Sequence, residues 1–406
     1  MTPLELVRTP LRVAFLTNFV SPYRRPVFES LAATEGWDFR VFVNATSEFD
    51  RNWTVDTSKL EVTQSKTWTR RRIRHHQTPI HYTEELSLHV PVGLFGDLRR
   101  FRPDVIVSCE LGPRSMVAAA YAKVYDVPLV IWSYHSLASM GCGKLQLAIR
   151  KTLLGACKSV VGMGEQAREV LERWNVPSSR IVDLLNATDH ATLEKRASEP
   201  GAQARADERR RALVGDRRVI LVVGRLIPLK GTAEILEAWR SLPQSLRNQW
   251  AIVFVGSGPF APMVEAAKDE HCHLAGHVAP SEMADWYLAA DLHLFASLGD
   301  VWGLVVNEAM GLGTPTICSV HAGAWNDLIE NGKSGFTFDP TIPQDFTRVL
   351  EDAMTHEDLG GIAAAAKASV ARCSSEAMAE RFRVAVAKAL GHAPAPPQVE
   401  ATRRAA

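Results

Sequence analysis

The stretch Val219-Ile220-Leu221-Val222-Val223-Gly224-Arg225-Leu226-Ile227-Pro228-Leu229-Lys230-Gly231 decides the fold of this chain. Its first five residues are all aliphatic, which predicts a strand that is buried on both faces, as strands of parallel sheets are. A glycine, a proline and a second glycine then mark a loop, and a helical pattern follows over residues 233–240. A buried strand that leads through a loop into a helix is the repeating unit of a parallel α/β sheet.

The same alternation extends over both halves of the chain. The first half contains strand-like runs at residues 12–16, 39–43, 105–108, 129–134, 158–161 and 180–185. The second half contains them at residues 218–223, 251–255, 273–275, 292–296, 315–319 and 335–338. Helical patterns and polar or glycine-containing turns separate these runs, so we expect two doubly wound α/β domains of similar size.

The boundary between the two domains is predicted near residue 195. A chain of 406 residues exceeds what one hydrophobic core usually supports. From residue 193 to 207 the composition shifts to Ala, Glu, Arg and Pro without a strand pattern, which indicates a linker. We expect, in chain order, an N-terminal domain (1–195), a C-terminal domain (196–374), a helix that packs back on the first domain (375–391) and a disordered tail (392–406).

The composition excludes several classes of protein. Hydrophobic residues make up 46% of the chain and charged residues 22%, and the net charge of +1 argues against a dedicated nucleic-acid binder. The six cysteines are dispersed without a C-x-x-C pair, so neither a disulfide framework nor a zinc ribbon is indicated. His271 and His273 flank Cys272, but neighbours in a strand point to opposite faces, so we predict no metal site. The N-terminus lacks a signal-peptide pattern and no run of 18 residues is apolar enough to span a bilayer, so we expect a cytoplasmic protein.

The loop that follows the first quoted strand carries two cations. In a parallel α/β sheet the carboxyl ends of the strands face the ligand crevice. Arg225, Lys230 and the start of the next helix therefore meet at one place, where a diphosphate would fit. A solvated loop with incidental basic residues is the alternative for this segment alone.

Two acidic residues lie further along the chain, in Leu298-Gly299-Asp300-Val301-Trp302-Gly303-Leu304-Val305-Val306-Asn307-Glu308-Ala309-Met310. Asp300 is predicted in a turn before a helix, and Glu308 about two turns into the helix. Such a pair of carboxylates is suited to binding sugar hydroxyls, although Asp300 could also cap the helix. Gly256 and Gly258 follow another strand and allow a close approach to the backbone there. The segment 275–278, which ends at Val278, follows a third strand, and its backbone could meet a nucleobase.

In order and spacing these motifs resemble the C-terminal half of the family 4 glycosyltransferases. The motifs are Gly224-Arg225 with Lys230-Gly231, then Gly256-x-Gly258-Pro259, then Asp300-x-Trp302-Gly303 with Glu308-Ala309-Met310, then Gly313-x-Pro315. The resemblance covers the second domain and extends more weakly to the first, where Asn186-x-x-Asp189 is similar to the exit turn of the family. It implies the GT-B fold, in which two Rossmann-like domains face each other across a cleft. It also implies a retaining reaction that needs no metal ion or other cofactor.

Carried over to this chain, the resemblance assigns roles to individual residues. Arg225 and Lys230 would hold the donor diphosphate and neutralise the charge of the leaving group. Glu308 would bind the ribose, and Asp300 would bind hydroxyls of the transferred sugar. His135, at a strand end of the first domain, would contact the donor sugar, unless Tyr134 faces the cleft instead. The donor-binding set is completed by Gly224, Gly256, Gly258, Val278 and the backbone of Trp302, Gly303 and Leu304.

The first domain is expected to carry the acceptor side. The candidates there are Asn18, Ser21, Tyr23, Arg24 and Glu110. The chain departs from the family at three points: the first acid is aspartate rather than glutamate, Trp302 replaces phenylalanine, and the first loop has no glycine pair. The last departure makes Arg24 a candidate substitute for the backbone that usually approaches the phosphates.

The run Arg70-Arg71-Arg72-Ile73-Arg74-His75-His76 follows Trp68 and is strongly basic. It could meet anionic lipid headgroups or a lipid-diphosphate acceptor, which would place the protein at the inner face of the membrane. A solvated loop is the alternative.

The sequence therefore predicts a glycosyltransferase that moves a hexose-type sugar from a nucleoside diphosphate to a glycan or lipid-linked acceptor, in surface polysaccharide or glycolipid synthesis. Two alternatives remain. A catalytically idle nucleotide-sugar sensor or scaffold would have no reason to keep Arg225, Lys230 and Glu308 together. A nucleotide-sugar epimerase of the same fold would need acids on both sides of the sugar, and the first half offers few beyond Glu110.

Overall fold

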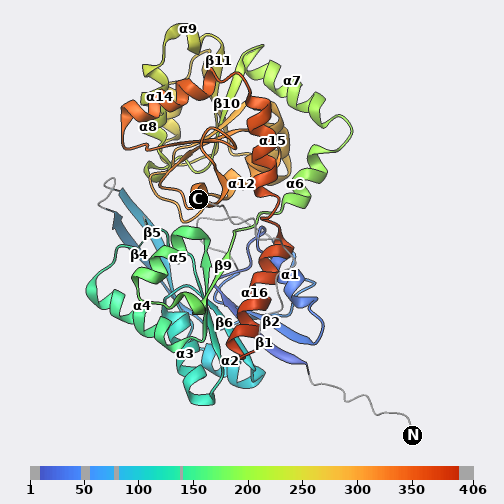
Figure 1. Cartoon of the computed structure of the whole chain (residues 1–406), viewed down its shortest axis with the longest axis vertical. Coiled ribbons are helices and arrows are strands. Elements are labelled where there is room, and N and C mark those ends of the chain that lie inside the picture. Colours follow the sequence, from blue (N-terminus) through green and yellow to red (C-terminus); the bar gives the residue numbers. More distant parts are fainter. Residues whose placement is uncertain (1–9, 47–54, 77–81, 138–139, 393–406) are drawn as a thin grey trace.

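The computed structural model describes residues 10–46, 55–76, 82–137 and 140–392. The tail expected at the C-terminus lies outside the described residues from position 393 onward. Figure 1 shows two α/β domains along the long axis of the molecule. The predicted fold is confirmed: each domain is built on a parallel sheet covered by helices on its faces.

The first domain is built on a seven-stranded parallel sheet of order β3-β2-β1-β6-β7-β8-β9. The strands are β1 (Leu11–Thr17), β2 (Trp37–Val43), β3 (Val62–Gln64), β6 (Val105–Cys109), β7 (Leu129–Ser133), β8 (Ser159–Met163) and β9 (Ile181–Leu184). The helices are α1 (Arg25–Ala32), α2 (Leu94–Phe101), α3 (Pro113–Tyr125), α4 (Lys144–Ala156) and α5 (Gly164–Arg173). All residues of β6, β7 and β8 are buried, because helices cover both faces of a parallel sheet.

The second domain is built on a six-stranded parallel sheet of order β12-β11-β10-β13-β14-β15. The strands are β10 (Arg218–Val223), β11 (Trp250–Val255), β12 (Cys272–Gly276), β13 (Leu292–Phe295), β14 (Thr316–Ser319) and β15 (Phe336–Phe338). The helices are α8 (Thr232–Ser241), α9 (Gln244–Arg247), α10 (Ala261–Ala266), α11 (Met283–Ala289), α12 (Leu304–Gly311), α13 (Ala324–Leu328), α14 (Pro343–Met354) and α15 (Leu359–Val370). Each strand-like run predicted from the sequence is a strand of one of the two sheets.

Two segments cross between the domains. After β9 the chain passes through α6 (His190–Ala197) and α7 (Ala202–Val214), which pack against α11 of the second domain. It returns as α16 (Ser375–Ala389), which lies on the first domain (Figure 1). There the Phe382 ring lies 5.2 Å from the Phe15 ring and 5.1 Å from the Trp132 ring, measured between centroids.

The carboxyl ends of the two sheets face each other. The backbone N–H of Glu165, directly after β8, donates to Asp327 Oδ2 of the second domain at 3.0 Å. The Gln166 amide donates to Asn326 Oδ1 at 3.0 Å. Because α5 begins at the carboxyl end of β8, these contacts bring the loops of both sheet edges to one interface, where ligands of open α/β sheets bind.

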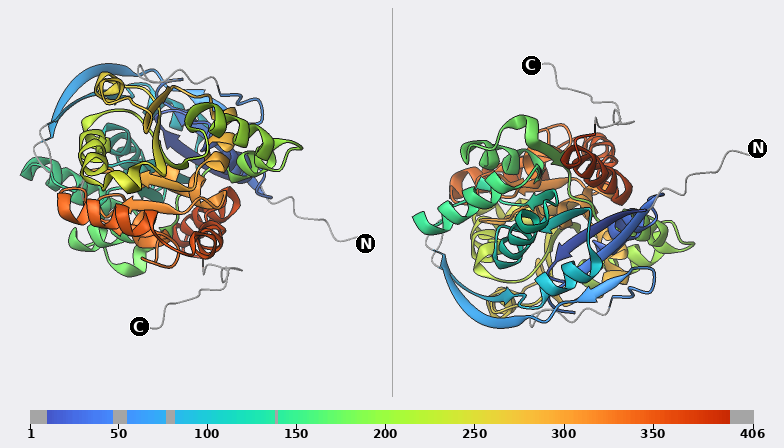
Figure 2. Two further views of the ribbon diagram at one scale, coloured as in Figure 1. Left: turned by 90° about the horizontal axis from the view of Figure 1, so that it is seen from above. Right: turned by 90° about the horizontal axis from the view of Figure 1, so that it is seen from below.

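The basic run is a strand, which the sequence did not predict. β4 (Trp68–His76) pairs antiparallel with β5 (Tyr82–Val90) in a two-stranded sheet of its own. Figure 2 shows this hairpin along the outer edge of the first domain. The side chains of Trp68 and Ile73 are 54% and 58% exposed, and they lie on opposite faces of the strand.

Candidate functional site

Lys230 and Asp300 form the centre of the site in the second domain. Lys230 ends the short helix η3 (Pro228–Lys230) after β10, and Asp300 lies in the loop after β13, so adjacent strands position them. The Lys230 ammonium donates to Asp300 Oδ2 and lies 5.1 Å from the centroid of the Phe295 ring. The other oxygen, Asp300 Oδ1, accepts the backbone N–H of Trp302 at 3.0 Å. The structure thus brings together a cation and an acid that are 70 residues apart in the sequence.

The charges around Asp300 keep it ionised. Burial alone would raise the pKa of Asp300, but Lys230, the Trp302 N–H and Arg225 lower the pKa by more, so it lies below its ordinary value. Arg225 is an exposed residue of the loop that also carries Lys230. A small hollow at the ends of β10 and β13 is lined by Gly224, Arg225, Lys230 and Phe295 among others. Two cations therefore border one hollow beside an ionised carboxylate.

Glu308 lies on α12, in the second turn of the helix. Its Oε2 accepts a hydrogen bond from the hydroxyl of Tyr287 on α11 at 2.8 Å. Burial raises the pKa of Glu308 to about 7, although the Tyr287 hydrogen bond opposes this rise. Burial and the nearby Glu308 raise the pKa of Tyr287 well above its ordinary value, so the phenol stays a donor. The Glu308 side chain is half-buried, and with a pKa of about 7 both its protonated and its ionised form are present near neutral pH.

The start of α12 depends on Gly303. This residue precedes the helix with φ of 101°, a conformation that favours glycine, and no side chain caps the helix there. A Cβ at position 303 would lie 2.7 Å from the Phe295 ring. Of the three backbone N–H groups predicted to face the donor sugar, that of Trp302 donates to Asp300 in this structure. Gly303 and Leu304 lie at the N-terminal end of α12, where a helix favours negative charge.

The turns after β11 and β12 join neighbouring strand ends. A Cβ on Gly256, whose φ is 149°, would lie 1.8 Å from the Gly224 carbonyl oxygen. The Gly256 N–H donates to Gly276 O at 2.7 Å, and the Gly224 N–H donates to Val255 O at 3.0 Å. These glycines therefore let loops of the protein approach each other closely, and a close approach of their backbone to the donor stays a prediction. Gly258 approaches Leu226 in the same way, and Val278 and Val223 are partly buried against the same apolar cluster.

A polar cluster lies at the carboxyl end of the first sheet. Asn18 and Glu110, both predicted, come together there: the Asn18 amide nitrogen lies 3.3 and 3.4 Å from the two carboxylate oxygens of Glu110. Tyr134 OH donates to Glu110 Oε1 at 2.5 Å. Arg114 donates to Asn18 Oδ1 at 2.6 Å, and the Asn44 amide donates to the same oxygen at 3.0 Å. Sequence reasoning missed the roles of Arg114 and Asn44, since only the fold brings their segments together.

Arg24 lies beside this cluster, against the returning helix α16. Its guanidinium lies 4.1 Å from the Trp132 ring and 5.6 Å from the Tyr23 ring, measured to the centroids. Burial lowers the pKa of Arg24. Ser21 is buried, and its carbonyl accepts the N–H of Arg24 at 3.0 Å, so it shapes the start of α1.

His135 contacts other residues of the first domain. Its ring packs edge-on to Trp174 with 5.1 Å between centroids, and Nδ1 lies 3.1 Å from Ser133 Oγ. The neighbouring Tyr134 is the residue that joins the polar cluster. A contact between His135 and the donor sugar stays a prediction.

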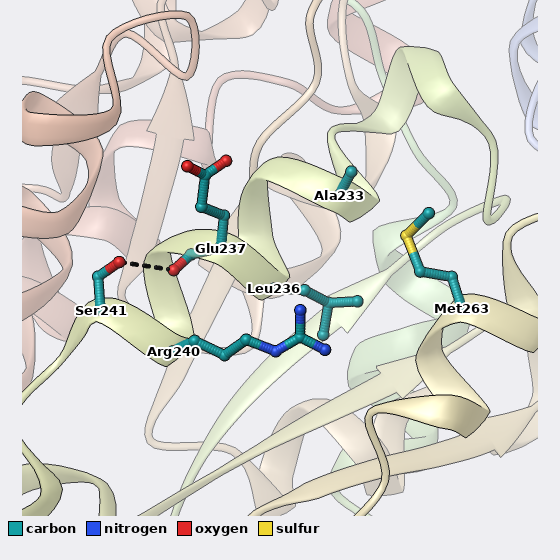
Figure 3. A pocket seen from close by; sticks show the side chains of 6 residues that line it. All are labelled: Ala233, Leu236, Glu237, Arg240, Ser241 and Met263. Carbon is teal, nitrogen blue, oxygen red and sulfur yellow. Dashed lines mark hydrogen bonds between the residues drawn. The ribbon is translucent and has the colours of Figure 1, made fainter.

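Three wider features of the molecule complete the description. A surface hollow of about 520 Å³ lies between α8 and α10, lined by Ala233, Leu236, Glu237, Arg240, Ser241 and Met263 (Figure 3), and contains none of the predicted site residues. In the part of the chain that the structure describes, no group of three or more His, Cys, Asp or Glu is placed to hold a metal ion. Over the same residues, no helix is both long enough and apolar enough to cross a membrane.

Each half of the chain matches the model of a known protein family. The model described as glycosyl transferases group 1 matches residues 204–368, and the glycosyl transferase 4-like domain model matches residues 20–187. The two matches cover most of both sheet domains, although β1 and Asn18 of the first domain lie before the start of the match.

Curated relatives match with moderate identity. The sulfoquinovosyl transferase SQD2 of Arabidopsis thaliana is 27% identical over 306 residues, which cover 71% of this chain and 58% of the relative. The D-inositol 3-phosphate glycosyltransferase of Thermobispora bispora is 30% identical over 239 residues, 55% of this chain and 54% of the relative. The chain thus spans a little over half the length of these relatives.

A solved structure matches over nearly the whole chain. Anabaena Alr3699/HepE in complex with UDP aligns with a TM-score of 0.70 at 16% identity and covers 92% of this chain and 98% of its own. The same Anabaena protein has also been solved in complex with UDP-glucose. At this identity the likeness supports the GT-B fold.

Proposed function

The chain belongs to the group 1 glycosyl transferase family, and from this membership we propose that it is a retaining glycosyltransferase. It transfers a hexose-type sugar from a nucleoside diphosphate to a hydroxyl of a glycan or lipid-linked acceptor. The second domain binds the donor, and the first domain supplies the acceptor side. The reaction requires no metal ion, because fixed cations of the protein take over the stabilisation of charge.

One observation carries this proposal: Lys230, Arg225 and Asp300 meet at the end of β10. In the reaction, the bond between the sugar C1 and the diphosphate oxygen breaks, and C1 forms a bond with the acceptor oxygen on the same face. The acceptor proton goes to the departing phosphate oxygen. Lys230 and Arg225 stabilise the negative charge that develops on that phosphate, at the start of α8, whose N-terminus also favours an anion.

The two carboxylates bind different parts of the donor. Glu308, on α12, accepts hydrogen bonds from the ribose hydroxyls. The hydroxyl of Tyr287 donates to the Glu308 carboxylate and holds it in place. Asp300 exchanges part of its contact with Lys230 for hydroxyls of the transferred sugar once the phosphate attracts the lysine. Asp300→Asn should therefore impair transfer more than it impairs binding of the free nucleoside diphosphate.

Arg24 belongs to the acceptor side of the cleft in this proposal. Its guanidinium is held over Trp132 at the carboxyl edge of the first sheet. From there it can approach a phosphate bound across the cleft, in place of the missing glycine pair. His135 remains a candidate contact to the donor sugar, at the same edge.

Contact with a membrane surface is supported by the β4–β5 hairpin. Arg70, Arg71 and Arg72 are exposed between the exposed Trp68 and Ile73. Arginines bind anionic headgroups, and each face of β4 combines them with an apolar side chain: Arg70 and Arg72 share a face with Trp68, and Arg71 shares a face with Ile73. Contact with an anionic membrane surface supports a role in surface polysaccharide or glycolipid synthesis. Flotation with phosphatidylglycerol vesicles should recover the wild-type protein and lose the Arg71→Glu/Arg72→Glu variant. Equal recovery of both would contradict membrane contact through this hairpin.

The direct test is turnover of defined donors. The protein is incubated with UDP-glucose, UDP-galactose, ADP-glucose or GDP-mannose, each with myo-inositol, D-inositol 3-phosphate, glucose or dodecyl maltoside as the acceptor. We expect transfer with retention of the anomeric configuration in at least one pair, in the presence of EDTA, and slow donor hydrolysis without acceptor.

Other outcomes would point to other functions. Calorimetry that shows tight donor binding, with neither transfer nor hydrolysis in any pair, would identify a nucleotide-sugar sensor. Release of an altered nucleotide sugar would identify an epimerase. Turnover that is lost with EDTA and restored by Mg²⁺ would contradict the metal-independent mechanism.

A further inference from the structure

Glu110 has a backbone conformation that its side chain does not favour. It is the first residue of the loop that follows β6, with φ of 69°, and only three other non-glycine residues among those described have positive φ. Left-handed backbone at a residue other than glycine, asparagine or aspartate costs free energy and persists where the surroundings enforce it, often at functional sites. A glycine would adopt this conformation without strain, so the side chain of Glu110 needs an explanation.

The neighbours hold the Glu110 carboxylate in one place. Tyr134 OH donates to Oε1 at 2.5 Å, and the Asn18 amide lies within 3.4 Å of both oxygens. Burial and the nearby Glu110 raise the pKa of Tyr134 well above its ordinary value, so Tyr134 remains a donor. These partners come from the loops after β1 and β7, on either side of β6 in the sheet.

The obvious structural role, that of a counter-ion for Arg114, explains little. Arg114 is buried, with 5% of its side chain exposed, and it lies 3.5 Å from Glu110 Oε2. Its shorter hydrogen bonds go elsewhere, to Asn18 Oδ1 at 2.6 Å and to the Cys109 carbonyl at 2.7 Å. Arg114 therefore holds Asn18 and the end of β6 in place. The carboxylate of Glu110 can still accept further hydrogen bonds.

The Glu110 carboxylate is accessible to solvent. The Glu110 side chain is 41% exposed, although its partners Asn18 and Tyr134 are only partly exposed. An ionised carboxylate has about four lone-pair directions, and the contacts of Glu110 with Tyr134, Asn18 and Arg114 leave room for a ligand. The carboxyl edge of the first sheet faces the second domain, as the contact between Glu165 and Asp327 shows. The open side of Glu110 thus belongs to the edge that faces the donor loops.

We infer that Glu110 is the acceptor-binding carboxylate of this protein: it accepts a hydrogen bond from a hydroxyl of a polyhydroxylated acceptor. Tyr134 and Asn18 are positioning residues that orient it, and Arg114 positions Asn18. The inference rests on the proposed function, since it presupposes an acceptor in the first domain. It also gives a reason for keeping glutamate in a left-handed backbone conformation that glycine would adopt without strain.

The test compares Glu110→Gln with wild type in two measurements. The first is transfer from UDP-glucose to D-inositol 3-phosphate, myo-inositol, glucose and dodecyl maltoside, together with hydrolysis of UDP-glucose without acceptor. Loss of one charge-assisted hydrogen bond should raise the acceptor KM about ten- to hundredfold. Hydrolysis and calorimetric UDP affinity should stay within about twofold of wild type. The second is saturation-transfer NMR of the same four polyols with UDP present, which needs no turnover; their signals should weaken in the variant.

A matched control is Asp126→Asn. Asp126 is also an acid with positive φ, at 55°, but it is exposed at the end of α3. Its removal should change neither KM, hydrolysis nor the NMR signals. Tyr134→Phe should raise the acceptor KM by less than Glu110→Gln does, because it removes a positioning contact and leaves the carboxylate.

The outcomes separate the inference from the proposed function. A wild-type protein that binds polyols through Glu110 in the NMR measurement but transfers nothing would contradict the function and support the site. Unchanged acceptor KM and NMR signals in Glu110→Gln would overturn the inference. So would an equal loss of hydrolysis, UDP affinity and thermal stability, which would show a structural role, or the absence of polyol binding by wild type.

Discussion

Lys230 and Asp300 share one partly buried contact, so removal of either residue also changes the surroundings of the other. Both were predicted, together with Arg225 and Glu308, from the loops and turns that carry them and from the resemblance to the family 4 glycosyltransferases. The contact between them was not, because 70 residues separate the two positions and only the neighbouring strands β10 and β13 bring them together. The pairing means that loss of the lysine also leaves Asp300 without its counter-ion.

Removal of Lys230 should weaken the stabilisation of the negative charge that develops on the departing phosphate. Lys230→Ala is expected to lower kcat/KM by roughly 2 to 4 kcal/mol in activation free energy, the scale of one preorganised electrostatic contact. Steady-state kinetics with the donor from the turnover screen measures this. Lys268→Ala is the control, because Lys268 also pairs with an acid, Glu265 at 3.2 Å, but lies on the outer surface. Kinetics of Lys230→Ala like those of wild type would remove Lys230 from the site.

Glu308 should make stability depend on pH. Its pKa rises from 4.5 to about 7 on burial, so the folded state binds the proton more tightly than the unfolded state does. Its contribution to stability is therefore fully present below about pH 4.5 and is lost as the pH rises through 7. Glu308→Gln cannot ionise, so its melting temperature relative to wild type should increase between pH 5 and pH 8. A constant difference over this range would contradict the raised pKa.

The same titration should appear in nucleotide binding. Ribose hydroxyls donate to the ionised carboxylate, so UDP affinity should rise with pH and level off above pH 7. Binding near pH 7 should release a proton, which calorimetry in buffers of different ionisation enthalpy detects. Glu308→Gln should bind UDP more weakly, without this pH dependence.

Tyr287, which donates a hydrogen bond to Glu308, belongs to no motif that could have identified it from the sequence.

At the scale of elements, a buried polar chain ties α12 to the first domain. Trp302 Nε1 donates to Asn307 Oδ1 at 2.7 Å, and the Asn307 amide donates to the Asn186 carbonyl at 2.9 Å. Trp302, Asn307 and Asn186 are 1%, 0% and 3% exposed. Asn186 directly precedes the crossing into the second domain, so the helix that carries Glu308 is bonded to the segment where the domains meet. Phenylalanine at position 302 could not donate this bond.

Trp302→Phe should therefore destabilise the protein. It leaves the Asn307 amide oxygen buried without its donor, which costs about 1 to 3 kcal/mol. Because removal of both partners costs less than removal of one, Trp302→Phe/Asn307→Leu should lose less than the sum of the two single changes. Chemical denaturation of the four proteins gives this coupling. Strict additivity would show that the hydrogen bond contributes nothing.

The elements differ in how well the sequence predicted them. Every strand of the two sheets except β3 was predicted, because most of them are buried apolar runs such as Val219–Val223. β3 was missed because it has only three residues and none of them is buried. The β4–β5 hairpin was missed because it has no such pattern: residues 68–73 of β4 are exposed on both faces, and the strand consists mostly of arginine and histidine. Its pairing with β5 satisfies the backbone and leaves little trace in side-chain periodicity.

At the scale of the whole molecule, the two domains share one apolar cluster. Phe15 and Trp132 of the first domain, Trp302 and Val306 of the second, and Phe382 of α16 all belong to it. The C-terminal helix thus completes the core of the N-terminal domain, and Arg381 Nε donates to the Asp183 carbonyl across the same contact at 2.6 Å. The sequence predicted that the helix packs back, but it offered no means to name the residues that it meets.

A change in this helix should therefore unfold the other end of the chain. Phe382 is 1% exposed, and Phe382→Ala should cost about 3 to 5 kcal/mol through the cavity it leaves between Phe15 and Trp132. The matched control is Phe346→Ala, because Phe346 is equally buried, in the second domain, 4.2 Å from the Phe338 ring between centroids.

Hydrogen exchange resolved by peptide distinguishes the two variants. Phe382→Ala should speed exchange in β1 and β7, which lie far away in the sequence, because these strands lose the cover of α16. Phe346→Ala should speed exchange in β14 and β15 instead. Since UDP binds the second domain in the proposed function, saturating UDP should offset the loss in Phe346→Ala more than in Phe382→Ala. Faster exchange confined to the second domain in Phe382→Ala would mean that the first domain keeps its core without α16, contrary to the packing described above.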